Sequence, residues 1–194
     1  TPGWGSATLV ENADDGMALD PQIAQDDSGN VIAVWRQADS SGRYSTLSNR
    51  YATGAWGAAE PIEQDNAGDA DSPQIAINAT GNAIAVWRQF DGSRYNVWSN
   101  RFTQGAWAGA ALIETDNAGD AHEPSVSINI NGDAISVWRQ YDGAHWNIWS
   151  NRYTAGSWSA AALVEENDAG DAYDPHAVID SSGNVISVWR QRGG

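Results

Sequence analysis

Amide, carboxylate and aromatic side chains recur together in this sequence, in a combination suited to hydroxyl-rich ligands. Gln89, Asp91 and Tyr95 lie close together, and similar residues at 140, 142 and 146 repeat their spacing. Carboxylates and amides hydrogen-bond to hydroxyl groups, and an aromatic ring packs against the apolar face of a sugar. We therefore predict a binding set for neutral sugars, comprising Tyr44, Gln89, Asp91, Tyr95, Gln140, Asp142 and Trp146.

A second polar feature is an acidic segment around a glycine, present at 65–71, 116–120 and 167–171. Oxygen-rich side chains at a turn are suited to Ca²⁺, although the spacing differs from the twelve-residue EF-hand loop. The alternative is a solvated turn whose Asp and Asn side chains bond to the backbone. No other cofactor is predicted. The candidate calcium ligands are Asp65, Asp69, Asp116 and Asp120.

An internal repeat of about 51 residues carries both features. Copies begin near Trp4, Trp56, Trp107 and Trp158, and Val-Trp-Arg-Gln recurs with its tryptophan at 35, 87, 138 and 189. Self-similarity at a fixed period indicates a tandem array. We therefore treat 1–194 as one domain, with no linker or second domain inside it.

Each repeat contains four short segments typical of β-strands. In the second copy we expect them at 74–77, 83–89, 95–102 and 106–114, separated by Gly-, Asn- and Asp-containing turns. Three tight hairpins and one longer crossing loop are the pattern of a propeller blade. The predicted fold is an all-β β-propeller of four such four-stranded blades, as an incomplete ring or as part of a larger one.

The crossing loop and the second hairpin tip are expected on the same face of the propeller. This geometry would group Asp69 with Gln89, Asp91 and Tyr95. It would likewise group Asp120 with the corresponding residues of the third copy.

The two ends of the chain do not match. Residues 1–11 have the pattern of a fourth strand, whereas the last copy ends after its second strand. In a closed ring the N-terminal strand would complete the last blade, which would still lack its third strand. We favour a larger ring or an assembly, because an unpaired strand edge can pair with another chain. The chain starts at Thr1 without a signal peptide, which indicates a processed product or a fragment.

The nine residues at 81–89 (Gly-Asn-Ala-Ile-Ala-Val-Trp-Arg-Gln) and the Ser-Asn-Arg segments at 48, 99 and 150 are similar to repeats of secreted bacterial proteins built from tandem blades. The resemblance covers the whole chain and implies a lectin-like propeller, secreted or at the bacterial cell surface. Its motifs specify a blade rather than an activity. The segment 180–184 does not have the spacing of the Asp-box of sialidase propellers, so no sialidase activity is carried over.

Composition excludes several classes of function. The chain has 10 Lys+Arg against 25 Asp+Glu, a formal net charge of −15. A surface this acidic repels phosphate backbones, which excludes nucleic acid as a partner. The absence of cysteine excludes thiol catalysis and disulfides. No apolar run is long enough for membrane insertion.

The repetition itself bears on function. The prominent polar residues occur once per blade, whereas an enzyme needs one asymmetric set of acid and base groups. We therefore predict a non-enzymatic, multivalent carbohydrate-binding propeller, in which weak sites act together. The alternative is a structural protein whose blades form a scaffold and whose open strand edges join subunits into a homo-oligomer.

Overall fold

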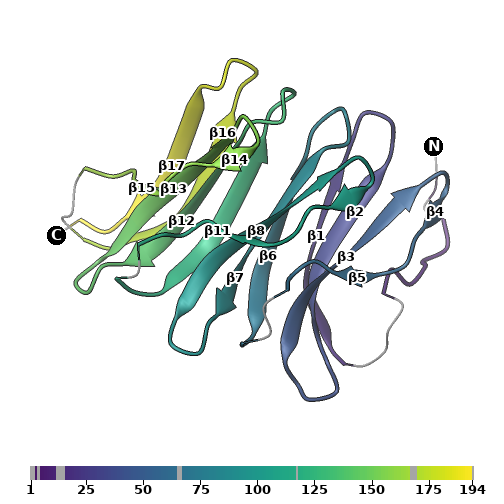
Figure 1. Cartoon of the computed structure of the whole chain (residues 1–194), viewed down its shortest axis with the longest axis horizontal. Helices are drawn as coiled ribbons and strands as arrows, with labels where there is room; N and C mark the ends of the chain where they lie inside the picture. The colour runs from purple at the N-terminus through teal and green to yellow at the C-terminus, as the bar shows by residue number, and fades with distance from the viewer. Residues whose placement is uncertain are drawn as a thin grey trace.

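A computed structural model describes residues 3, 5–11, 16–64, 67–116, 118–166 and 170–193. These residues form strands and turns and contain no helix, so none of them belongs to a helix that could cross a bilayer. The strands form four antiparallel sheets that follow one another in a row (Figure 1).

The first three sheets have five strands each and the last has two. The first contains β1 (Ala18–Gln25), β2 (Val31–Ala38), β3 (Tyr44–Ala52), β4 (Ala55–Trp56) and β5 (Glu60–Pro61). The second contains β6 (Ala70–Ile77), β7 (Ala83–Phe90), β8 (Tyr95–Thr103), β9 (Ala106–Trp107) and β10 (Ala111–Leu112). The third contains β11 (Ala121–Ile128), β12 (Ala134–Tyr141), β13 (Trp146–Thr154), β14 (Ser157–Trp158) and β15 (Ala162–Leu163). The last contains β16 (Ala172–Ile179) and β17 (Val185–Gln191).

Side-chain hydrogen bonds set the tight turn between the first two strands of a blade. The Asn78 Oδ1 atom accepts hydrogen bonds from the backbone N–H groups of Thr80 and Asn82, each at 3.1 Å. Gly81 has a φ of +82°, which glycine adopts without steric cost. The turn composition seen in the sequence therefore has the local role that was predicted for it.

The first strand of each blade begins earlier than predicted. β6 starts at Ala70 rather than at 74, because a β-bulge between Asp71 and Gln74 lets the crossing segment continue the pairing with β7. Ser72 takes a φ of +53° at this bulge. Pro73 follows it and has no N–H to contribute to the ladder.

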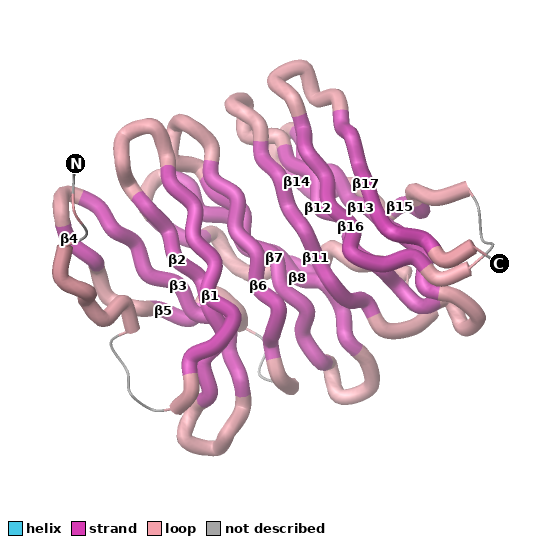
Figure 2. Tube along the Cα trace, turned by 180° about the vertical axis from the view of Figure 1, so that it is seen from behind, coloured by secondary structure: helices cyan, strands magenta, loops and turns pink. Residues whose placement is uncertain are grey.

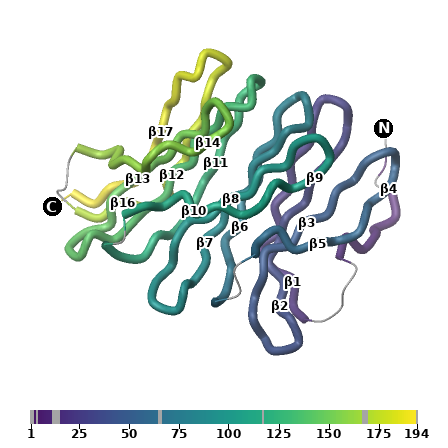
Figure 3. The backbone as a smooth tube through the Cα atoms, in the orientation of Figure 1, coloured from purple at the N-terminus to yellow at the C-terminus, as the bar shows by residue number. Residues whose placement is uncertain are grey.

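The predicted fourth strand is divided into two short strands. β9 and β10 both pair with β8 and follow one another along it (Figure 3). The buried Asn100 side chain explains the interruption. Its Oδ1 accepts the Gly109 N–H at 2.9 Å, while its Nδ2 donates to the Ile62 carbonyl of the preceding blade at 2.8 Å.

The sheets pack face to face through apolar side chains. Ile32 and Val34 of the first blade lie in one cluster with Trp87 of the second, and all three are at most 1% exposed. Ile84 and Val86 pack in the same way with Trp138 of the third. Burial at this level supplies most of the stabilisation of such a stack. The repeated tryptophans therefore fill the space between blades.

The described residues form an open array rather than a closed ring. The first and last sheets lie at opposite ends of the row (Figure 1). The N-terminal segment lies against the first sheet, where Asn49 Nδ2 donates to the Val10 carbonyl at 2.7 Å, and not against the last. The inner strands β1, β6, β11 and β16 follow one another across the molecule (Figure 2).

Candidate functional site

A stacked arginine and aromatic ring recur in each complete blade. The arginine comes from Val-Trp-Arg-Gln on the second strand, and the ring belongs to the first residue of the third strand. The hairpin register makes the two diagonal neighbours on one face of the sheet. The guanidinium carbon lies 4.7, 4.5 and 4.3 Å from the ring centroid in Arg36–Tyr44, Arg88–Tyr95 and Arg139–Trp146. Each aromatic ring that was predicted to contact a ligand is therefore half-buried and makes a cation–π contact with an arginine.

A carboxylate at the bulge of the inner strand pairs with the same arginine. Arg36 Nε lies 2.8 Å from Asp20 Oδ2, and Arg139 Nη2 lies 3.0 Å from Glu123 Oε1. Arg88 pairs with Asp71. These ion pairs fix the orientation of the guanidinium planes.

The aspartates of the crossing segments bond to the ring residue of the preceding blade. Asp69 Oδ1 accepts the Tyr44 backbone N–H at 2.9 Å, and Asp120 Oδ1 accepts that of Tyr95 at 2.8 Å. The predicted grouping of Asp69 with Gln89 and Tyr95 holds for its backbone, because the Asp69 carbonyl accepts the Phe90 N–H at 3.0 Å and Phe90 pairs with Tyr95. The side chain of the crossing segment faces back across the junction, which the order of the residues in the chain does not reveal.

The predicted calcium ligands are not brought together in the described part of the chain. Asp65 lies outside the described residues, and Asp116 Oδ1 accepts the Ala118 backbone N–H at 3.2 Å. Within the described residues, no three His, Cys, Asp or Glu side chains form a group that could hold a metal ion. Calcium binding stays a prediction.

Gln89 and Gln140, predicted as ligand contacts, lie in the junctions between blades and are each 1% exposed. Gln140 Oε1 accepts the Trp138 indole N–H at 2.9 Å, and Gln140 Nε2 donates to Glu114 Oε1 at 2.9 Å. The previous junction has the same arrangement, with Gln89 Nε2 donating to Glu63 Oε2 at 3.2 Å. Both amides therefore join blades and have little contact with solvent.

The glutamate in this arrangement was not singled out from the sequence. Glu114 is fully buried, and burial raises the pKa of its carboxyl group, while the hydrogen bond from Gln140 acts in the opposite direction. Its recurrence at 63, 114 and 165, each time at the end of a predicted fourth strand, was the available signal.

Asp91 and Asp142, also predicted as ligand contacts, hold the second hairpin turn. Asp91 Oδ1 accepts the backbone N–H groups of Ser93 and Arg94, and its Oδ2 accepts from Asn96 Nδ2 at 2.8 Å. These bonds, led by the one from the Arg94 backbone, hold the pKa of Asp91 well below its usual range. The backbone N–H of His145 is the main cause of the lowered pKa of Asp142. Both carboxylates therefore stabilise the second hairpin turn.

One position on the inner strand differs in every blade. It pairs directly with the invariant arginine, and the four residues that occupy it are Leu19, Asp71, His122 and Tyr173. The surrounding scaffold repeats while this position changes from an aliphatic side chain to a carboxylate, an imidazole and a phenol. The signal in the sequence is that these four positions are equivalent in the repeat but differ in residue type.

His122 lies at the centre of this set, at the junction of the second and third blades. Its ring packs between Tyr95 and Trp146, with centroid separations of 5.3 and 5.1 Å. Arg88 Nη1 contacts His122 Nδ1, and His122 Nε2 lies 4.0 Å from Asp120 Oδ2.

Tyr173 occupies the equivalent position one blade further on. The guanidinium carbons of Arg139 and Arg190 lie 4.9 and 5.0 Å from its ring centroid. Its hydroxyl donates to Asp171 Oδ2 at 2.9 Å, and this hydrogen bond raises the pKa of Tyr173. A pocket of about 360 Å³ is lined by Tyr173, Arg190, Gln191 and Arg192.

This face therefore combines half-buried rings with groups able to exchange protons. The arginine-paired carboxylates Asp71 and Glu123 are held as acceptors. His122 and Tyr173 carry the exchangeable protons, and Arg139 lies between Trp146 and Tyr173. Such an arrangement can bind a hydroxyl-rich ligand and can also perform acid–base chemistry on it.

No protein-family model and no curated protein matches the chain. Its structure is similar to a protein of unknown function from Dyadobacter fermentans, with a TM-score of 0.68, 14% identity, and coverage of 95% of this chain and 65% of that one. It is also similar to an ulvan lyase bound to a GlcA–Rha3S saccharide, with a TM-score of 0.66, 9% identity, and coverage of 90% and 50%. A Hadza microbial sialidase has a TM-score of 0.59, 12% identity, and coverage of 92% and 47%.

The chain thus spans two thirds or less of the length of these structures. They overturn the prediction of a non-enzymatic binding module or scaffold, because stacked blades of this kind support carbohydrate-active enzymes. Repetition of the scaffold did not exclude an asymmetric centre within it. The chain has a β-propeller-like fold that it shares with polysaccharide lyases and glycoside hydrolases.

Proposed function

We propose that this chain binds a carbohydrate at the face of the arginine–ring pairs and acts on it chemically, with His122 and Tyr173 as acid–base groups. The observation that carries this proposal is the non-repeating inner-strand position. Catalysis needs one asymmetric constellation, and Asp71, His122 and Tyr173 supply it in a scaffold that otherwise repeats.

Binding would use the half-buried rings. Tyr95 and Trp146 lie on either side of His122, so a sugar packed against them would lie next to the imidazole. The pocket beside Tyr173, between β16 and the end of β17, offers a second contact region. A polysaccharide substrate would be met outside the cell, in keeping with the predicted secreted or cell-surface location.

Proton transfer would use the two groups differently. Histidine exchanges protons near neutral pH, so we assign His122 the proton transfer to and from the substrate carbon or hydroxyl. Tyr173 stays protonated because Asp171 accepts its hydrogen bond. On substrate binding, the Tyr173 hydroxyl would exchange Asp171 for the leaving oxygen as the acceptor of its single proton.

The test is turnover of a panel of neutral and uronate-containing polysaccharides by the 194-residue chain. New reducing ends without ultraviolet absorbance indicate hydrolysis, and an absorbing unsaturated product indicates elimination. We expect His122→Asn to lower the rate by about 10²–10⁴-fold, the usual contribution of general acid–base catalysis. His176→Asn is the matched control, because His176 is an exposed histidine on β16 away from the arginine–ring pairs.

Equal rates for His122→Asn and the parent chain would contradict the assignment of the centre. Absence of both turnover and binding across the panel would overturn the proposed function. Repeating the assay with calcium and with EDTA tests the predicted calcium binding of the acidic segments. Unchanged activity in EDTA would show that the activity does not require calcium.

A further inference from the structure

The outer faces of the first and last sheets resemble the two surfaces that meet at each internal junction between blades. At each internal junction, one blade presents an Ile–Val pair from its second strand. The pairs Ile32–Val34, Ile84–Val86 and Ile135–Val137 are all at most 4% exposed. The next blade presents a tryptophan and apolar residues of its inner strand, as Trp138 and Val126 do.

The last blade presents the same pair with nothing against it in the described structure. Ile186 is 69% exposed and Val188 is 61% exposed, although their counterparts in the other blades are buried. Val178 of β16, which pairs with Ile186, is 61% exposed as well. This end is therefore the Ile–Val half of a junction.

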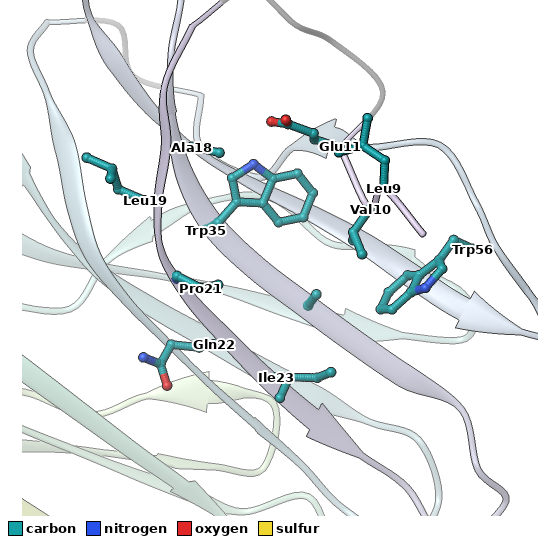
Figure 4. Close-up of a pocket in the computed structure, with 11 residues that line it drawn as sticks. Leu9, Val10, Glu11, Ala18, Leu19, Pro21, Gln22, Ile23, Trp35 and Trp56 are labelled. Atoms are coloured by element: carbon teal, nitrogen blue, oxygen red, sulfur yellow. The ribbon is translucent and has the colours of Figure 1, made fainter. Parts of the chain in front are cut away.

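The first blade presents the other half. A pocket of about 420 Å³ is lined by Leu9, Val10, Ile23, Trp35 and Trp56, among others (Figure 4). The counterparts of Ile23 and Trp56 in the second blade are Ile75 and Trp107, and these pack in one cluster with Ile32 and Val34. The pocket is therefore lined by the same kinds of residue that contact an Ile–Val pair at an internal junction.

The N-terminal segment shows how such a junction is assembled. Asn49 Nδ2 donates to the Val10 carbonyl at 2.7 Å, as Asn100 Nδ2 donates to the Ile62 carbonyl at 2.8 Å. Val10 thus takes the place of the residue that the preceding blade supplies at an internal junction. What this end lacks is the first two strands of a preceding blade, and the other end of the array presents two such strands, β16 and β17.

We propose that a second copy of this chain docks head to tail, with its Ile186–Val188 face in the pocket between Trp35 and Trp56. The contact continues the internal blade junction and uses sheet faces rather than the strand edges predicted from the sequence. Two chains of net charge −15 repel one another. Because salt screens this repulsion, the association should strengthen as ionic strength rises.

The experiment is sedimentation velocity over a concentration series at low and high salt. We expect the mass to rise from 20.7 kDa to at least twice that value. Val188→Asp and Ile23→Asp should each weaken self-association by roughly 100-fold or more, because each would bury an unpaired charge. Both side chains are exposed in the single chain, so the fold should survive, as thermal melts will show. Ser181→Asp adds the same charge to the β16–β17 turn, off the face, and should associate like the parent.

Mixing the two defective variants distinguishes the head-to-tail contact from a symmetric one. Ile23→Asp keeps an intact Ile–Val face and Val188→Asp keeps an intact pocket, so the mixture should form a one-to-one dimer and nothing larger. Either variant associating alone as strongly as the parent would overturn the proposal. So would a parent chain that stays monomeric throughout the series, or a mixture that stays monomeric while the parent associates.

Discussion

Replacing Gln140 by alanine separates a role between blades from a role in ligand binding. The amide links the Trp138 indole to the Glu114 carboxyl group, at 2.9 Å on each side. Its removal leaves two fully buried polar groups without their partner. Each such group costs about 1–3 kcal/mol, so we expect a loss of about 2–6 kcal/mol in the free energy of unfolding.

The assay is urea unfolding followed by tryptophan fluorescence, with stability compared through the midpoint at constant m. Repeat arrays can unfold in steps, so hydrogen exchange of β11 to β13 should locate the loss at the junction of the second and third blades. Gln64→Ala, at an exposed glutamine, is the control and should change stability little. A loss below about 1 kcal/mol for Gln140→Ala, together with loss of sugar binding, would show that Gln140 contacts the ligand and does not stabilise the junction.

Three further substitutions test other parts of the structure. Burial raises the pKa of Glu114 above its usual 4.5, so its folded form holds the proton more tightly and the chain loses stability as pH rises through the raised pKa. Glu114→Gln should therefore unfold at a higher urea concentration than the parent at neutral pH, and this difference should disappear below pH 4.5. Equal urea midpoints of the two proteins at both pH values would contradict this prediction. Asn129 is 4% exposed and donates from Nδ2 to the Asp180 carbonyl at 3.0 Å, so Asn129→Asp should keep its own turn but set a buried carboxylate oxygen against that carbonyl. We expect a loss of at least about 1–3 kcal/mol in urea unfolding, and an unchanged midpoint would disprove the role of this bond. Trp146→Leu should weaken sugar binding in calorimetry by roughly tenfold, through loss of about 1.4 kcal/mol of stacking, and unchanged affinity would remove the ring from the binding face.

Much of the fold follows from local chemistry. The Asn78 turn, the β-branched segment at 83–89 and the glycine at 81 specify a hairpin without reference to the rest of the chain. The period of about 51 residues then implies identical sheets that must stack to bury their faces. For this reason the order of the strands, and the missing third strand of the last repeat, were predictable, whereas the division of the fourth strand was not.

The positions of the functional side chains were less predictable. Strands buried on both faces have no polar side, so alternation cannot tell that Gln89 and Gln140 point into a junction. The turn role of Asp91 depends on the donors within its reach in the folded hairpin. The Asp69 side chain reaches the Tyr44 backbone of the preceding blade, while its own backbone stays beside the Phe90–Tyr95 pair.

The repeat, the strands and the residue types at each turn follow from the amino-acid sequence, because they depend on interactions among neighbours in the chain. Which repeated polar residues are buried between blades, and which reach the surface, depends on how the sheets pack. The tertiary structure also brought Asp71, His122 and Tyr173 to one face from inner strands about 51 residues apart. Stacking of the sheets creates that proximity, and no local pattern contains it.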